Sequence, residues 1–396
     1  MNTHSASLTA ELDEVVSAPR AARRLLRELQ RPSDVFANLG PNWYASIMGT
    51  GIVANAAALL PLHSTGLLRA ALVIWALDAV LLVALTAATA VHWVRYPAVA
   101  RSHASDPAMA QFYGAPPMAL LTVGAGALLV GHQLLGMHAA VIVDSVLWGL
   151  GTATGLLSSV AIPYLMFTRH RIDQPMTLAT WLMPIVPPMV SAATGAALIA
   201  HLPAGQAQLT LLLGCYAMFG LSLVASLVII TLVWARLAYH GTGAAQTVPT
   251  FWIVLGPLGQ SVTAVNLLAT QAPHVIGAPY ASAMSAMGLL YGVPIWGFAM
   301  LWLALAAAIT IHQARQRLPF TLTWWSFTFP VGTVVTGTSE LALRSHLDMF
   351  NGAAVGLYGL LVIAWLTAAV YTLRNSLSGR LFLPPTPAPV LPATDA

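Results

Sequence analysis

Ten apolar stretches, each longer than 20 residues, make up the greater part of this chain. A helix needs roughly 20 apolar residues to cross the hydrocarbon core of a bilayer. The expected spans are 42–62, 66–94, 114–135, 140–168, 176–200, 207–238, 249–270, 279–311, 320–344 and 350–373. The fold class that this pattern predicts is an all-α integral membrane protein with ten transmembrane helices.

Composition supports this interpretation. The 396 residues are 58% hydrophobic and 7% charged, whereas soluble domains carry about 25% charged residues. A chain so apolar cannot cover itself with polar surface, and its natural partner is the lipid bilayer. The single cysteine, Cys215, excludes a disulfide within the chain and a cysteine-based metal site.

The 16 basic residues are all arginines, and their distribution predicts the topology. They gather before the first expected span and after the even-numbered spans, with Arg344 as the main exception. Because cytoplasmic loops carry the excess of positive charge, both termini are expected in the cytoplasm, with the chain in the plasma (inner) membrane. Residues 1–35 then form a cytoplasmic segment, 36–375 the transmembrane domain, and 376–396 a disordered proline-rich tail.

The odd-numbered spans carry helix breakers that the even-numbered ones mostly lack. Positions 49, 117, 187, 257 and 330 recur at intervals of 68, 70, 70 and 73 residues. This spacing predicts five helical hairpins, each with a broken and a plainer helix. The breakers near these positions are Gly49-Thr50-Gly51, Gly124, Pro187-Pro188, Gly256-Pro257 and Pro330.

A broken helix leaves backbone groups without partners, and hydrocarbon does not tolerate them. Pro330, for example, is expected to free the carbonyl of Ser326 inside the ninth span. The five broken helices should therefore surround a central pore, with Thr333 and the breakers lining it. Alternatively, the small residues only allow helices to pack closely.

Two segments resemble a known family. Pro41–Gly51 (PNWYASIMGTG) and Trp324–Pro330 (WWSFTFP) are similar to the first-helix and ninth-helix signatures of the tellurite-resistance/dicarboxylate transporter family. The resemblance implies a homotrimer whose protomers each have a pore of five inner helices. It also implies a phenylalanine plug at mid-membrane, either Phe329 or, with the register shifted by two, Phe327. Val331-Gly332-Thr333 is more similar to the malate and sulfite exporter branch.

Charged residues within spans are costly, so each is a candidate for function. Asp78 is expected to bond a neighbouring helix or subunit, and Asp144 to lie at the membrane interface. Glu340 and Arg344 are four residues apart, which predicts one helix face near the outer end of the ninth span. They either form a structural salt bridge or act as outer-mouth charges that attract anions.

The expected function is transport of a small anion, such as a C4-dicarboxylate (malate), sulfite, tellurite or an inorganic anion, through a gated pore. The alternative is a proton-coupled dicarboxylate or sulfite exporter, suggested by His92, His132 and His312 near the membrane faces. A membrane-embedded redox enzyme is a remote alternative, because no two histidines are three or four residues apart. No enzyme activity, cofactor, metal or nucleic-acid partner is expected.

Overall fold

The computed structural model describes residues 25–62, 64–170 and 177–384, and all the regular elements in these ranges are helical. Seven helical segments are long and apolar enough to cross a membrane. They are Thr65–Arg95, Ala110–Leu135, Met137–Thr168, Gln206–His240, Ala245–Val275, Tyr280–Gln316 and Asp348–Ser378. The prediction of an all-helical membrane protein is confirmed at this level.

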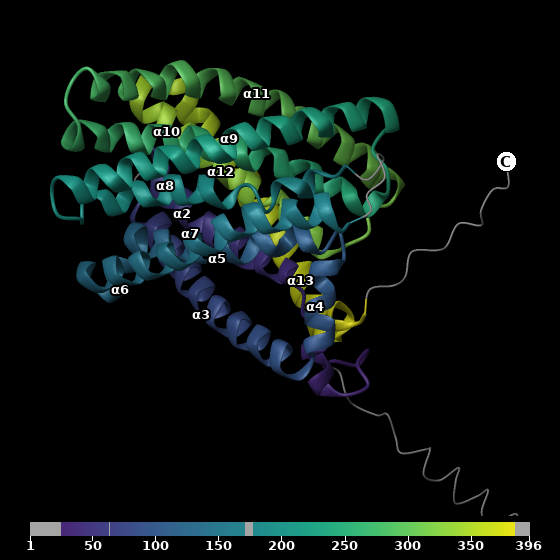
Figure 1. Ribbon diagram of the computed structural model, residues 1–396. Coiled ribbons are helices and arrows are strands. Elements are labelled where there is room, and N and C mark those ends of the chain that lie inside the picture. Colours follow the sequence, from purple (N-terminus) through teal and green to yellow (C-terminus); the bar gives the residue numbers. More distant parts are fainter. Residues whose placement is uncertain (1–24, 63, 171–176, 385–396) are drawn as a thin grey trace, which may run out of the picture.

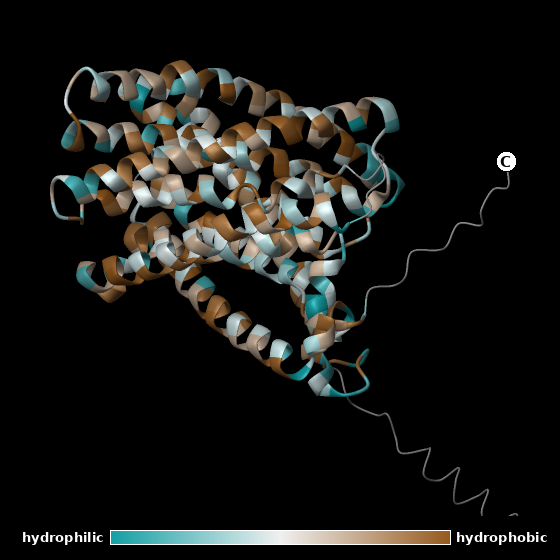
Figure 2. Cartoon of the chain, viewed as in Figure 1, coloured by the Kyte–Doolittle hydropathy of each residue, from teal (hydrophilic) through white to brown (hydrophobic). Residues whose placement is uncertain are grey.

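Helices of two kinds alternate along the chain (Figure 1). Five long helices expose apolar side chains over most of their length. Figure 2 shows many hydrophobic residues, in brown, along the ribbons of the bundle. They are α3 (Thr65–Arg95), α7 (Met137–Thr168), α9 (Gln206–His240), α11 (Tyr280–Gln316) and α13 (Asp348–Ser378). Side chains that face lipid should be apolar, so these helices form the outer layer.

Five shorter helices are almost wholly buried between the long ones. They are α2 (Tyr44–Leu59), α5 (Ala115–Gly126), α8 (Pro187–Ile199), α10 (Leu255–Val275) and α12 (Phe329–Ser345). After α5 the chain continues through a π-helical turn, η4 (Ala127–Gly131), into α6 (His132–Leu135). The buried helices coincide with the spans predicted to carry helix breakers.

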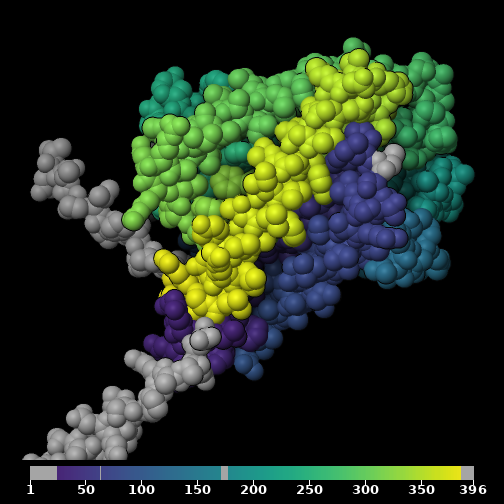
Figure 3. Space-filling model, turned by 180° about the vertical axis from the view of Figure 1, so that it is seen from behind, coloured from purple at the N-terminus to yellow at the C-terminus, as the bar shows by residue number. Residues whose placement is uncertain are grey.

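The buried helices form a closed ring. In order, α2 contacts α5, α5 contacts α8, α8 contacts α10, α10 contacts α12, and α12 contacts α2. Each long helix packs on the buried helix before it and on the next one in the ring, so that α3, for example, contacts α2 and α5. The last helix, α13, returns to α2 and crosses the back of the molecule between the green of α11 and the blue of α3 (Figure 3).

A stretch of 3₁₀-helix or tight turn precedes each buried helix. These stretches are η2 (Pro41–Trp43), η3 (Ala110–Gly114), η6 (Ala179–Leu182), η7 (Ala245–Val254) and η8 (Leu322–Phe327). Pro187 is the first residue of α8 and Pro330 the second of α12. The span predicted to be broken is divided just before Pro330, because η8 ends at Phe327 and α12 begins at Phe329, so the proline stands at the start of a helix and not inside one. A proline in the first turn replaces an N–H that has no helical partner.

The expected break at Gly49-Thr50-Gly51 is absent, because α2 is continuous from Tyr44 to Leu59. A β-carbon at Gly49 would collide with the hydroxyl of Thr328 on η8–α12. A β-carbon at Gly51 would collide with the carboxylate of Asp78 on α3. These two glycines allow close packing of α2, which was the alternative interpretation.

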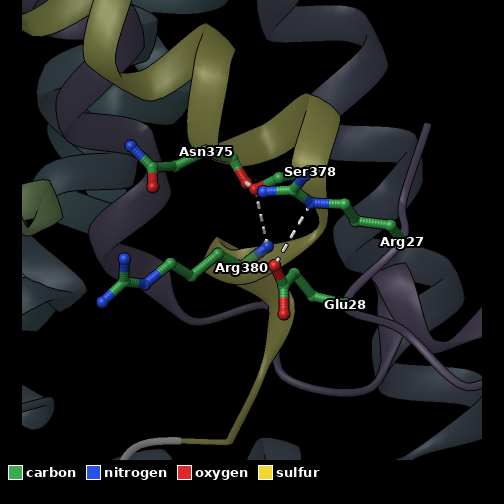
Figure 4. A network of polar contacts seen from close by, with 5 residues as sticks. All are labelled: Arg27, Glu28, Asn375, Ser378 and Arg380. Carbon is green, nitrogen blue, oxygen red and sulfur yellow. Dashed lines mark hydrogen bonds and ion pairs between the residues drawn. The ribbon is translucent and has the colours of Figure 1, made fainter. Parts of the chain in front are cut away.

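The two ends of the described chain are joined (Figure 4). The backbone N–H groups of Leu26 and Glu28 donate to the carbonyls of Leu377 and Ser378 at 2.7 and 3.0 Å. In this region Arg27 pairs with Glu28 at 3.4 Å, and the N–H of Arg380 donates to Oγ of Ser378 at 3.4 Å. The first and last parts of the bundle therefore lie at the same end.

The same end holds the remaining short elements, η1 (Pro32–Phe36), α4 (Pro97–Ser105) and η9 (Arg380–Phe382). The ring of Phe382 on η9 stacks on that of Trp43, with 5.1 Å between centroids. Residues 376–384, predicted to begin a disordered tail, thus include the end of α13 and a packed turn. The rest of the predicted tail and residues 1–24 of the N-terminal segment lie outside the described residues.

Candidate transport pathway

A cavity of about 170 Å³ lies inside the ring of buried helices. All five helices contribute side chains to its wall. At one end its lining includes Ala197 and Thr270, which are exposed. At the other end it closes on Phe329, of which only 2% is exposed. The cavity is therefore a vestibule that opens beyond the carboxyl-terminal parts of α8 and α10 and ends at an aromatic side chain.

The polar lining of the cavity is uncharged. It consists of Asn55, Thr122, Thr194, Gln260, Thr263, Thr270, Gln271 and Thr336. Several of these hydroxyls donate to carbonyls of their own helices, as Thr122 does to Met118 at 2.7 Å and Thr194 to Val190 at 2.9 Å. Among the described lining residues none carries a formal charge, so the wall can solvate an ion without holding it tightly.

The sequence analysis missed Gln260, Thr270, Gln271 and Thr336 as lining residues. A signal was available on α10, where the lining side chains Gln260, Thr263 and Leu267 follow one another at intervals of three and four residues. Such spacing places side chains on one face of a helix. Prolines and glycines mark instead the helix starts and the contacts between helices.

Phe329 and Phe327 lie in different surroundings. Phe329 is the first residue of α12 and forms part of the cavity wall. Phe327 is not in the wall. It packs edge-on against Trp252, with 5.2 Å between ring centroids, and against Trp324 at 6.0 Å. The geometry therefore favours Phe329 over Phe327 as the side chain that could obstruct the cavity.

Buried helices on either side of Phe329 run parallel. Gly49 of α2 contacts Thr328, and Ile52, three residues later, fills the space beside Gly332 of α12. Residue numbers therefore increase in the same direction along α2 and α12. In the same way Gly259 and Thr263 of α10 meet Thr333 and Thr336 of α12. The amino-terminal ends of these helices thus lie at the closed end of the cavity, where their partial positive charges favour an anion.

None of the predicted glycines and prolines lines this cavity. They lie at helix starts or at contacts between helices: Gly49, Gly51, Gly124, Pro187, Pro188, Gly256, Pro257 and Pro330. Gly124 faces Asp144 of α7, and Pro187 packs against Gly155 of the same helix. A β-carbon at Gly256 would meet no atom within 4 Å, so this buried glycine borders open space.

The two predicted pore-lining threonines bind other helices instead. Thr50 accepts a hydrogen bond from Nε1 of Trp365 on α13 at 3.1 Å. Thr333 donates within α12 to the carbonyl of Pro330 at 2.6 Å and lies 3.3 Å from the carbonyls of Leu255 and Gly256. Thr333 therefore joins the start of α10 to α12 and is not in the wall of this cavity.

Glu340 and Arg344 do not form the expected salt bridge. Among the described residues the ion pair found within 4.0 Å is that of Arg27 and Glu28. Arg344 donates to Oδ1 of Asn266 at 2.6 Å and to Oγ of Ser285 at 3.0 Å. It also reaches the hydroxyl of Thr270, a cavity-lining residue, at 3.3 Å. The arginine thus stands beside the open end of the cavity.

Two aspartates are fully buried between helices. Asp78 and Asp144 have 0% exposure, and both oxygens of each lack a hydrogen-bond partner within the described chain. The expected bond from Asp78 to a neighbouring helix is therefore not formed within the part of the chain that the structure describes. Asp144, predicted to be interfacial, is covered by α5 at Gly124.

Comparison with known proteins now identifies the family. Residues 38–373 match the SLAC1 family profile, described as voltage-dependent anion channel. This chain belongs to the SLAC1 family. It is therefore a multi-pass membrane protein of an anion channel and transporter family, and not an enzyme. The predicted resemblance and the predicted class of function are confirmed.

Relatives of this SLAC1 family protein are similar over nearly their whole length. A sulfite efflux pump of Trichophyton rubrum is 27% identical over 354 residues, which cover 87% of this chain and 93% of the pump. An uncharacterized transporter of Methanocaldococcus jannaschii is 24% identical over 90% of this chain and 99% of the transporter. A putative malic acid transport protein of Schizosaccharomyces pombe is 21% identical over 86% of this chain and 80% of that protein.

Proposed function

We propose that each protomer transports a small anion through a pore at the centre of the ring of buried helices. In this proposal the three shorter helices α2, α8 and α12 also contribute to crossing the bilayer, giving ten spans as five hairpins. The observation that supports it best is the closed ring of five buried helices around a polar, uncharged cavity. The protomers assemble as a homotrimer, as the family resemblance implies.

Phe329 is the gate in this proposal. Its ring ends the cavity at the start of α12, where the helix is preceded by 3₁₀ structure that can change its backbone angles. A hydrophobic constriction of this kind blocks ions because water leaves it. Displacement of the ring would join the vestibule to the opposite side of the membrane.

The electrostatics favour an anion over a cation. The amino-terminal ends of α2, α10 and α12 lie toward the closed end, and helix amino termini stabilise negative charge. Arg344 adds a positive charge beside the open end, and its partners there are uncharged oxygens. An anion would be attracted to the vestibule and bound weakly enough to leave it.

The substrate class follows from the relatives. One is named a sulfite efflux pump and another a putative malic acid transport protein. We therefore place sulfite and C4-dicarboxylates first among substrates, ahead of tellurite and inorganic anions such as nitrate or chloride. The chain resides in the plasma (inner) membrane with both termini in the cytoplasm. The arginine distribution supports this topology, as does the pairing of the two chain ends.

The test is a flux assay in liposomes that contain the purified protein. Sulfite, malate, tellurite, nitrate and chloride would each be supplied at equal gradients, with empty liposomes and potassium flux as controls. We expect at least one of the anions to cross much faster than in empty liposomes, and potassium not to cross. Flux of potassium alone, or of no anion, would contradict the proposal.

Proton-coupled export is a second candidate, but the predicted histidines do not support it. His92 and His132 each lie against a backbone carbonyl, at 2.7 and 2.8 Å, and His312 lies beside Gln316 at 3.2 Å. None of the three lines the cavity. The observation that favours coupling is a buried carboxylate, Asp78, close to the cavity wall.

A further inference from the structure

Asp78 lies near the middle of α3 and is completely enclosed by protein. Its exposure is 0%, and neither carboxylate oxygen has a hydrogen-bond donor within the described chain. An ionised carboxylate without donors or a counter-ion is very unfavourable in such a place, whereas the neutral acid is tolerated. The arrangement seen here therefore favours the neutral form of Asp78.

One layer of side chains separates Asp78 from the cavity. Its Oδ2 occupies the space that a side chain at Gly51 would need, and the methyl group of Thr122 lies 2.7 Å from the same point. Thr122 is part of the cavity wall, as is Asn55, which donates to the carbonyl of Thr122 at 3.0 Å. The Oδ1 of Asn55 also lacks a hydrogen-bond partner among the described residues. Thr122 is therefore the wall residue that lies next to the space shared by Gly51 and Asp78.

Asp78 also lies at the depth of Phe329. Gly51 is between Gly49, which contacts Thr328, and Ile52, which fills the space beside Gly332. Phe329 lies between those two residues of α12. A change in the contact between α3 and α2 at Asp78 would therefore occur at the same depth as Phe329, which closes the cavity.

The helices packed on Asp78 offer it no partner of opposite charge. The titratable group on α2 is Tyr44, two turns from Gly51, and α5 and η4 have none. On α3 itself Arg69 is nine residues away, and His92 and Arg95 lie near the far end. There α3 meets η1 and α4, which carry Asp34, Arg101 and His103. Ionisation of Asp78 would thus require water.

We propose that Asp78 is the proton-binding residue of the transport cycle. To ionise, it must gain access to water from the cavity, which requires α2, α3 and α5 to separate at the depth of Phe329. The carboxylic acid then gives its proton to water on one side of the membrane, and the carboxylate takes a proton from water on the other side before the contact closes. No other bond changes. The proposal rests on the anion transport proposed above and adds that protons move with the anion.

The experiment uses nitrate as the transported ion, because nitrate does not itself take up protons, and a pH-sensitive dye inside the liposomes. Wild-type protein should move protons together with nitrate. Asp78→Asn should still carry nitrate but move no protons. Asp144→Asn is the matched control, because Asp144 is as buried and as unpaired but lies against Gly124, which does not line the cavity. It should keep the coupling.

Proton movement that persists in Asp78→Asn, or is lost equally in both variants, would overturn the assignment. If Asp78→Asn does not fold, Asp78→Glu decides: a shifted pH dependence of coupling supports the proposal, and an unchanged one contradicts it. Nitrate flux without proton movement in the wild type would refute the coupling but leave anion transport intact. If nitrate is not carried, the infrared carbonyl band of protonated acids still tests the assignment, because it should lose a component in Asp78→Asn, and an unchanged band would overturn it.

Discussion

Nε of Arg344 donates to Oδ1 of Asn266 at 2.6 Å, joining the end of α12 to the middle of α10. The same guanidinium reaches the carbonyl of Asn266 at 3.0 Å and the hydroxyl of Thr270 at 3.3 Å. Gly288 on α11 leaves the room that both side chains occupy. The arginine is thus fixed beside the cavity mouth by hydrogen bonds to neutral acceptors, and its positive charge lies where an anion would enter in the proposed pathway.

Replacement of Arg344 by glutamine should lower the rate at which anions enter. Removal of a positive charge weakens attraction over a distance of about 10 Å at ordinary ionic strength. We expect a several-fold loss of anion flux at low salt and a much smaller loss at high salt. The difference is measured as anion flux into liposomes that contain wild-type protein or Arg344→Gln, at low and at high ionic strength.

Arg344→Lys is the matched control for the charge, because it keeps the charge and loses the hydrogen-bonding fork. It should retain most of the low-salt flux. A loss in Arg344→Gln that is equal at both salt concentrations would mean that the arginine acts only through its bonds to Asn266.

The contact between α10 and α12 should not tolerate a methyl group at Gly259. A β-carbon there would collide with the backbone of Thr333 and Val334. Overpacking of this kind costs about 1–3 kcal/mol. We expect Gly259→Ala to lower the unfolding temperature in detergent clearly, whereas Gly256→Ala, one turn earlier and free of contacts within 4 Å, should not. Equal melting temperatures for the two variants would argue against this helix contact.

His103 on α4 should make the protein less stable in acid. Burial lowers the pKa of this imidazole from its ordinary value of 6.5, and the neighbouring His92, whose ring is 5.4 Å away, lowers it further, against the opposing effect of Asp106. The unfolded chain then binds more protons than the folded one as pH falls below about 6.5. The free energy of unfolding is therefore unaffected by His103 above that pH and decreases as the pH falls below it.

His103→Gln should reduce this acid-induced fall in the unfolding temperature. His240→Gln, at the exposed end of α9, serves as a control and should leave the fall unchanged. A pH dependence that is the same in wild type and His103→Gln would show that other groups cause it.

The sequence predicted correctly those features that depend on the residues of a single helix. Apolar length predicted the helices, and the period of the breakers predicted which of them are buried. It also placed Phe329 in the middle of the expected pore, where the side chain does line the cavity. Its role as the gate remains a proposal.

The sequence did not predict those contacts that join residues far apart along the chain. Arg344 seemed to pair with Glu340, four residues away, but its partner Asn266 is 78 residues away. A proline shows that a helix cannot continue through it, but Pro330 equally suits the start of a helix, and that is where it lies. Gly49 and Gly51 leave room for Thr328 and Asp78, which no local pattern reveals.

Anion flux through Phe329→Ala tests the central claim most directly. Without the ring, the cavity should be open toward the other side of the membrane, so the account predicts at least a several-fold rise in flux of whichever anion the wild type carries. Phe327→Ala, outside the cavity wall, is the control and should change flux little. Unchanged flux in a folded Phe329→Ala protein, or a larger rise in Phe327→Ala, would contradict the account.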